Sequence, residues 1–203
     1  MTREQQKKFK EIRTALPKIL QSVSKEYGFK KKDYMVWSKK QEMIFTIFVF
    51  ERVLDGRCYI DITIQFKPFW VDNLLWDILQ MPENKNQPVS LRCVGAFSVN
   101  GCVLYKETTE LVDWSIDELI DCTDSAMKKF AVIIDETQSE DFKVQADTNP
   151  YHSDIREVLM LVHNREYDVA IEYAKNMPDD CFVNKGLGFR TAVIQYCEKQ
   201  KED

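Results

Sequence analysis

The chain has 203 residues, of which 44% are hydrophobic and 30% charged, and its formal net charge is −5. This composition is typical of a globular protein and excludes a disordered, collagen-like or low-complexity chain. No run of about 18 apolar residues is present, and the first ten residues are polar and charged rather than signal-like. We therefore expect a cytoplasmic protein without a membrane-spanning segment.

An amphipathic helix is predicted over residues 4–27, where apolar residues recur at steps of three and four. Pro17 should kink this helix, and Gly28 should end it. Residues 1–33 carry ten Lys and Arg against four acids, a net charge of +6. A basic helix can bind nucleic acid or a membrane surface, but the negative charge of the whole chain favours a solvated helix face. We predict neither nucleic acid nor membrane as a partner.

Strands are predicted at residues 34–38 and 42–52, and Asp55-Gly56 is typical of a two-residue type I′ hairpin turn. This turn makes the numbers of facing residues sum to about 111 and places Phe45 opposite Phe66 on an apolar face. The opposite face, called the second sheet face below, mixes aromatic and charged side chains as recognition surfaces do. Its candidate binding residues are Phe48, Phe50, Arg52, Tyr59, Asp61 and Tyr105. Two plainer readings stay open, namely that C-terminal helices cover this face and that Arg52 and Asp61 only neutralise each other.

A short helix is predicted over residues 71–80, and Asn100-Gly101 predicts a second hairpin between residues 91–99 and 102–105. This hairpin puts Tyr105 on the second sheet face. The resulting fold class is α+β, with a five-stranded antiparallel sheet made of a meander and a hairpin and packed with helices.

A helix over residues 116–135 is predicted to begin at a capping box formed by Ser115 and Glu118. Its outer acidic face carries Asp117, Asp121 and Asp124, which a divalent metal could use, although a solvated face is the simpler reading. Residues 107–147 hold twelve acids against three lysines, a net charge of −9, which suits a basic protein partner. We predict no metal.

Residues 136–150 are polar and unpatterned and are predicted to link two parts, residues 1–147 and a helical appendage of residues 148–203. The stretch LMLVHNREYDVAIEYAKNM resembles a tetratricopeptide (TPR)-like helix pair. One such pair cannot bury its own apolar face, so we expect the appendage to pack against the rest of the chain.

Catalytic motifs such as a P-loop, G-x-S-x-G or H-E-x-x-H do not occur in the sequence. Both histidines, His152 in the linker and His163 at a helix end, are interpreted as structural. The six cysteines lie apart in apolar segments and are interpreted as reduced core thiols rather than as disulfides or zinc ligands. We therefore predict no cofactor and no catalytic residues.

The order of elements, with Gly28-Phe29-Lys30-Lys31 before a meander whose first strand holds Trp37, resembles a bacterial family, domain-of-unknown-function family 4304, over residues 5–135. The resemblance implies a bacterial cytoplasmic protein and brings no known activity. We expect a non-enzymatic protein-binding module of an immunity-like or adaptor kind. The alternative is a small-molecule binder or enzyme with the second sheet face as a pocket wall, where Arg52 would take an anionic group beside Asp61 or Tyr59.

Overall fold

Two compact units make up the chain. The first, called the sheet unit below, combines residues 1–66 with residues 103–141, and the second, the helical unit, combines residues 67–102 with residues 142–203. This grouping differs from the predicted division after residue 147, because residues 67–102 belong with the C-terminal segment. The computed structural model describes residues 1–142, 150–177 and 182–202.

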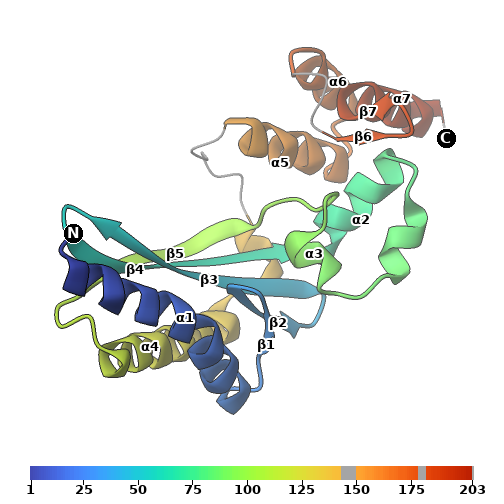
Figure 1. Cartoon of the computed structure of the whole chain (residues 1–203). Coiled ribbons are helices and arrows are strands. Elements are labelled where there is room, and N and C mark those ends of the chain that lie inside the picture. Colours follow the sequence, from blue (N-terminus) through green and yellow to red (C-terminus); the bar gives the residue numbers. More distant parts are fainter. Residues whose placement is uncertain (143–149, 178–181, 203) are drawn as a thin grey trace. The chain divides into compact units, whose positions relative to one another are not determined.

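The sheet unit contains a five-stranded antiparallel sheet, and the α+β class is as predicted. Each strand lies beside its neighbour in the chain, in the order β1-β2-β3-β4-β5, so the whole sheet is one meander (Figure 1). The strands are β1 (Lys30–Lys32), β2 (Met35–Lys40), β3 (Met43–Leu54), β4 (Arg57–Pro68) and β5 (Cys102–Leu111).

Helices α1 (Arg3–Glu26) and α4 (Ile116–Glu136) both begin at capping boxes. The Ser115 side chain accepts a hydrogen bond from the backbone N–H of Glu118, as predicted, and Thr2 and Gln5 cap α1 in the same way. Such caps satisfy backbone N–H groups that have no partner within the helix. Pro17 lies inside α1, and the positive φ of 73° at Gly28 lets the chain turn into β1.

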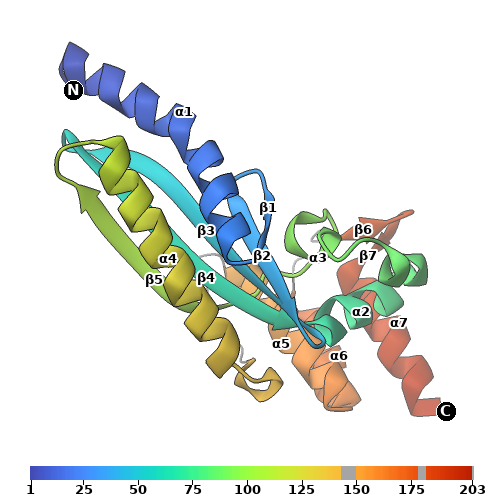
Figure 2. The same cartoon turned by 90° about the horizontal axis from the view of Figure 1, so that it is seen from below.

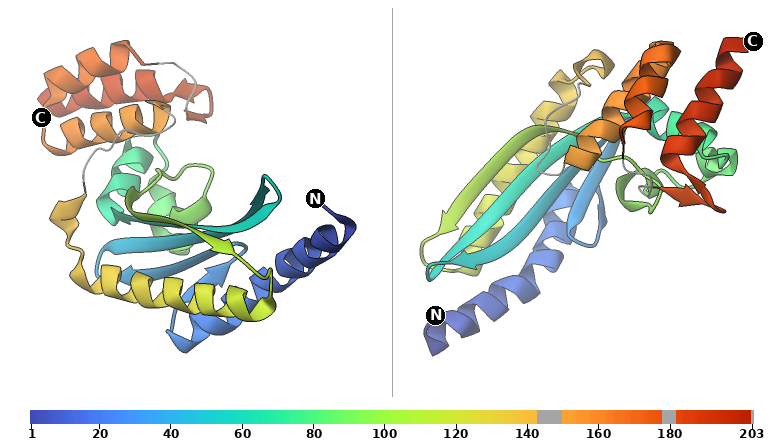
Figure 3. Two further views of the ribbon diagram at one scale, coloured as in Figure 1. Left: turned by 90° about the vertical axis from the view of Figure 1, so that its left-hand side faces the viewer. Right: turned by 90° about the horizontal axis from the view of Figure 1, so that it is seen from above.

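The core of the sheet unit lies between one face of the sheet and helices α1 and α4, which Figures 2 and 3 show on the same side of the sheet. Ring centroids of Phe45 and Phe66 are 5.7 Å apart, in keeping with the facing arrangement that the Asp55-Gly56 turn predicts. Both turn residues have positive φ angles, 50° and 74°, as a type I′ turn requires. The largely buried core side chains include Ile12, Leu16, Leu20, Phe45, Ile47, Val49, Phe66, Leu119 and Phe130.

The predicted second hairpin is wrong. Residues Leu91–Val94 form the short helix α3, and β5 pairs with β4 instead of with the segment before Asn100-Gly101. The helical turn lets Arg92 reach the carbonyl of Phe69 and the amide of Asn73. These buried polar contacts are lost if the segment is an extended strand at the sheet edge.

The helical unit is built from five α-helices and a small hairpin in its described part. Helices α5 and α6 are joined by a tight turn in which Arg165 has a φ of 64°, and α7 packs on α6. Helix α2 contacts both α5 and α7, so the appendage does pack on an earlier part of the chain, as expected. The TPR-like character of the α5–α6 pair stays a prediction. The bounds are α2 (Phe69–Ile78), α5 (Pro150–His163), α6 (Tyr167–Lys175) and α7 (Phe189–Glu202), with 3-10 turns at Pro82–Asn86 and, in the sheet unit, at Ser139–Asp141.

Two details of the C-terminal prediction need correction. The segment is not all-helical, because β6 (Val183–Asn184) and β7 (Leu187–Gly188) form a hairpin around Gly186, whose φ is 85°. His152 belongs to α5 rather than to a linker. Residues 143–149 of the predicted linker lie outside the described residues. Among the described helices, none combines the length and the apolar character needed to cross a membrane.

Candidate functional site

The second sheet face is the side of the sheet turned away from α1 and α4. Successive side chains of a strand point to opposite faces, so the burial of Val49 against the helices places Phe48, Phe50 and Arg52 on the other face. Along β3 this second face becomes more open, from 1% exposure at Ile44 to 47% at Phe50. A large aromatic side chain that is nearly half exposed is typical of a contact surface.

A continuous aromatic row crosses this face. Phe48 and Phe50 are stacked with ring centroids 6.2 Å apart, and Phe50 meets Tyr34 at 6.1 Å. Tyr34 belongs to the turn between β1 and β2 and is 37% exposed. The row therefore has three members, of which the sequence analysis predicted two. Pairing of Met35 with Phe48 brings the turn beside β3, a register that the sequence analysis did not derive.

Arg52 and Asp61 form an ion pair at one end of the row. The Arg52 Nε donates to one oxygen of Asp61, while Thr108 donates to the other oxygen at 2.6 Å. The Arg52 guanidinium also lies 4.9 Å from the ring centroid of Tyr59. The two charged residues are thus brought together, as the plainer reading of the sequence predicts.

The ionisation of this pair follows from its contacts. Partial burial raises the pKa of Asp61, but the hydrogen bonds from Arg52 and Thr108 outweigh burial and hold this pKa below its ordinary value. The hydrogen bond with Asp61 raises the pKa of Arg52. Both groups are charged at neutral pH and already have partners. This arrangement suits a surface of fixed shape better than a general base or a free anion-binding cation.

Tyr105 does not belong to the second sheet face, which corrects the prediction. Without the second hairpin, the alternation along β5 puts Tyr105 on the α4 side, where Lys129 of α4 lies 5.1 Å from its ring centroid. Its hydroxyl donates to Glu107, at 2.8 Å, two residues along the same strand. The predicted set is therefore split, with five members on one face and Tyr105 on the other.

The acidic face of α4 is also divided. Asp124 pairs with Lys128 and accepts a hydrogen bond at 2.8 Å from Tyr27, the residue that follows α1, and these contacts lower its pKa. Asp117 is exposed, whereas Asp121 lines a pocket of about 320 Å³ between β5 and α4. Of the three predicted aspartates, Asp121 therefore faces this pocket, whereas Asp124 is held by internal contacts.

Carboxylates dominate this pocket between β5 and α4. Glu118 accepts hydrogen bonds from the backbone N–H groups of Val112, Asp113 and Ser115, and Glu110 pairs with Arg57. Burial raises the pKa of the Cys122 thiol at the same pocket, which leaves the sulfur protonated and a poor nucleophile at neutral pH. The lining is acidic in character and largely occupied by internal contacts.

Metal-ligating residues do not gather within the described part of the chain, where no group of three or more His, Cys, Asp or Glu is placed to hold an ion. Five cysteines in this part are free thiols, namely Cys58, Cys93, Cys102, Cys122 and Cys197. Cys181 lies outside the described residues.

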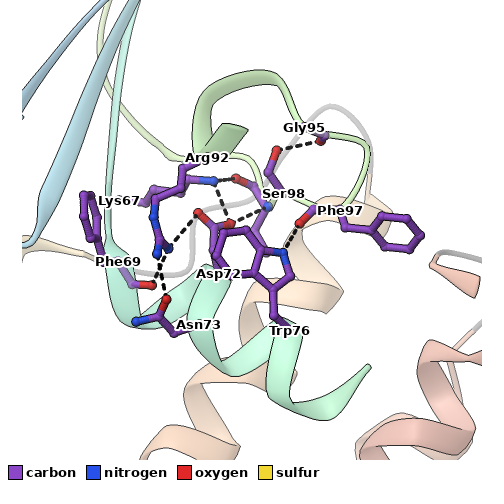
Figure 4. Close-up of polar contacts among 10 residues, drawn as sticks. Lys67, Phe69, Asp72, Asn73, Trp76, Arg92, Gly95, Phe97 and Ser98 are labelled. Carbon is purple, nitrogen blue, oxygen red and sulfur yellow. Dashed lines mark hydrogen bonds and ion pairs between the residues drawn. The ribbon is translucent and has the colours of Figure 1, made fainter. Parts of the chain in front are cut away.

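A buried charge cluster in the helical unit was not anticipated from the sequence. Lys67 and Arg92 share the carboxylate of Asp72, which is fully buried at the first turn of α2 (Figure 4). The Lys67 Nζ lies 2.8 Å from Asp72 Oδ1, and the backbone N–H of Val99 donates to the same oxygen at 3.0 Å. The only sequence signal is the presence of charged residues inside the apolar run from Phe66 to Leu79.

This cluster ties the loop after α3 onto α2. Lys67 also donates to the Val99 carbonyl at 2.5 Å, and the indole N–H of Trp76 donates to the Phe97 carbonyl at 2.6 Å. The Arg92 guanidinium lies 4.5 Å from the ring centroid of Trp76. Each charged group is met by polar or aromatic partners, so we interpret the cluster as a structural anchor.

Comparison of the chain with models of known families, with curated proteins and with solved structures found no match. The resemblance to family 4304 thus stays a prediction.

Proposed function

We propose that the protein is a non-enzymatic protein-binding module of the bacterial cytoplasm, of an immunity-like or adaptor kind. The observation that carries this proposal is the partly exposed aromatic row Tyr34–Phe50–Phe48 on the second sheet face. Aromatic side chains supply most of the binding energy at many protein interfaces, because they bury a large area and lose little conformational entropy.

The Arg52–Asp61 pair supports this proposal rather than the alternative of a small-molecule site on the same face. Arg52 already has Asp61 as a partner and lies near the ring of Tyr59, so its position next to the aromatic row is defined by two contacts. Polar groups around an apolar centre are typical of protein interfaces.

The partner that we propose is a basic protein. The alternation along β5 puts Glu110 on the second sheet face, on the strand at one end of the sheet order, and Glu107 and Asp121 line the pocket on the α4 side of the same strand. Opposite charge at the border of an interface steers association and disfavours partners of the same sign. Such an interaction weakens as salt screens it.

Affinity capture with matched variants tests the proposal. Phe50→Ala removes the most exposed ring of the row, and Val132→Ala is the control, since Val132 is 48% exposed on α4 and outside the row. We expect a basic protein to be retained in stoichiometric amounts by the wild type and by Val132→Ala, and to be lost from Phe50→Ala and at high salt. Absence of such a protein, or equal retention by both variants, would refute the proposal.

A further inference from the structure

A second concave site lies within the helical unit. A pocket of about 270 Å³ is lined from α2 by Trp70 and Asp77, from the end of α5 by His163, and from α7 by Tyr196. Arg165 in the α5–α6 turn and Tyr167 at the start of α6 also belong to the lining. This volume is near the lower end for ligand sites in proteins and fits a molecule of about one ring with a short substituent.

Trp70 and His163 together provide an aromatic wall in a fixed orientation. The Trp70 ring is stacked on His163 with a centroid distance of 3.9 Å and an interplanar angle of 12°. Phe142 meets Trp70 edge-on, at 5.7 Å and 86°. An aromatic wall held by these ring contacts does not have to be ordered when a ligand binds, which reduces the entropy cost of binding.

Several hydrogen-bond donors of the pocket lining have no protein partner among the described residues. Neither the hydroxyl groups of Tyr167 and Tyr196 nor the indole N–H of Trp70 makes a hydrogen bond with the chain as described. Burial raises the pKa of Tyr196, and the nearby charge of Asp77 adds to this effect, so the phenol keeps its proton. The pocket therefore offers O–H and N–H groups that a ligand with acceptor atoms would satisfy.

The charges at the pocket favour an anion. Asp77 is the acidic side chain of the lining, and Lys85, at an Nζ to Oδ1 distance of 2.5 Å, offsets part of its charge. Arg165, in contrast, forms no ion pair within the described residues. Guanidinium groups bind carboxylates through two parallel hydrogen bonds.

We propose that this pocket binds a small aromatic carboxylate, with its ring at the Trp70 wall and its carboxylate at Arg165 and the tyrosine hydroxyls. The site lies in the helical unit and uses none of the residues of the proposed protein-binding surface. The two proposals therefore stand or fall separately.

Titration of the full chain with benzoate, followed by ¹H–¹⁵N NMR of the tryptophan indole signals, tests this proposal. The Trp70 signal is identified by its loss in Trp70→Phe. We expect it to shift with benzoate at millimolar concentrations, and to shift much less with benzylamine, which carries the opposite charge, or with acetate, which has no ring.

Charge variants separate specific binding from weak general association. Arg165→Gln should weaken benzoate binding about 10-fold or more, because a hydrogen-bonded charge partner is lost. Lys199→Gln is the control, since it removes an exposed positive charge from α7 outside the pocket lining. The proposal is wrong if Trp70 does not respond to benzoate, if benzylamine binds equally well, or if both charge variants bind benzoate like the wild type.

Discussion

Two buried cations share one buried carboxylate in the helical unit. Because the positive charges outnumber the negative charge, removal of the carboxylate and removal of one cation should change the free energy of unfolding by different amounts. The side chains of Lys67, Asp72 and Arg92 are 4%, 0% and 6% exposed. Asp72→Ala would leave two cations without their anion, whereas Lys67→Met would leave one cation with one anion. We therefore expect Asp72→Ala to be the more destabilising substitution.

The magnitudes follow from the contacts that each variant loses. Asp72→Ala removes the acceptor for Lys67 at 2.8 Å and for the Val99 N–H at 3.0 Å, and breaking a buried ion pair in this way costs about 3–5 kcal/mol. In Lys67→Met the carboxylate keeps the Val99 N–H and Arg92, whose nearest nitrogen is 3.7 Å away. Its main loss is the donor to the Val99 carbonyl, which is worth about 1–2 kcal/mol.

Urea denaturation followed by tryptophan fluorescence measures both free energies of unfolding, since the Trp76 ring lies next to Arg92. Asp77→Ala is the control, because Asp77 belongs to the same helix and pairs with Lys85, but both side chains are 36% exposed. Exposed pairs contribute about 0–1 kcal/mol. Equal losses for Asp72→Ala and Asp77→Ala, or a larger loss for Lys67→Met than for Asp72→Ala, would contradict the reasoning.

The same cluster predicts a dependence on pH. Burial lowers the pKa of Lys67 below its ordinary value of 10.5. Between the lowered pKa and 10.5 the unfolded chain binds more protons than the folded protein, so this group adds stability as the pH rises through that interval. Lys67→Met should remove this contribution, and an unchanged alkaline slope of the free energy of unfolding in the variant would contradict it.

Three further predictions concern the sheet unit. Glu118→Ala removes the acceptor of three backbone N–H groups before α4 and should cost about 1–2 kcal/mol in urea denaturation, whereas Asp117→Ala, an exposed neighbour, should cost less. Burial raises the pKa of Cys58 to about 11, so at pH 8 the thiolate fraction of Cys58 is about 100-fold lower than it would be with the ordinary pKa of 9.0. Alkylation of Cys58 in the folded protein should therefore be slower, by at least that factor, than alkylation of the same residue in urea. The pKa of Asp61 is lowered in the folded protein, so Asp61 stabilises the fold above its ordinary pKa, and this stabilisation is lost as the pH falls through its folded-state pKa. Asp61→Asn should therefore make the free energy of unfolding less dependent on pH in the acid range. An unchanged acid dependence would be evidence against the contacts described.

Features that depend on a few neighbouring residues could be predicted from the sequence. The capping box at Ser115 and Glu118 and the turn at Asp55-Gly56 each fix the backbone locally, and the structure has both. The turn also sets the register of β3 and β4, and this register brings Arg52 next to Asp61. A local signal therefore correctly predicted one contact of the candidate site.

Features that depend on distant residues could not be predicted in this way. Asn100-Gly101 has the same local signal as Asp55-Gly56, but β5 pairs with β4 across more than thirty residues of chain. The contacts of Arg92 with Phe69 and Asn73, about twenty residues earlier, favour a helical turn where the local pattern favours a strand. Because Tyr105 follows Asn100-Gly101, the wrong strand pairing also led to the prediction that Tyr105 lies on the second sheet face.

The distribution of perturbed groups bears on the choice between binding and catalysis. Active sites keep groups with shifted pKa values available to a substrate. In the described chain, the shifted pKa of Asp61 results from contacts with Arg52 and Thr108, and that of Lys67 results from burial beside Asp72. Asp61 and Lys67 are already occupied by internal partners, whereas the exposed aromatic ring of Phe50 and the donors around Trp70 are not, and among these donors the Tyr196 hydroxyl, whose pKa burial raises, keeps its proton. The groups left for another molecule are thus aromatic rings, hydroxyls and a guanidinium, which act by contact and hydrogen bonding, and they favour recognition over proton transfer.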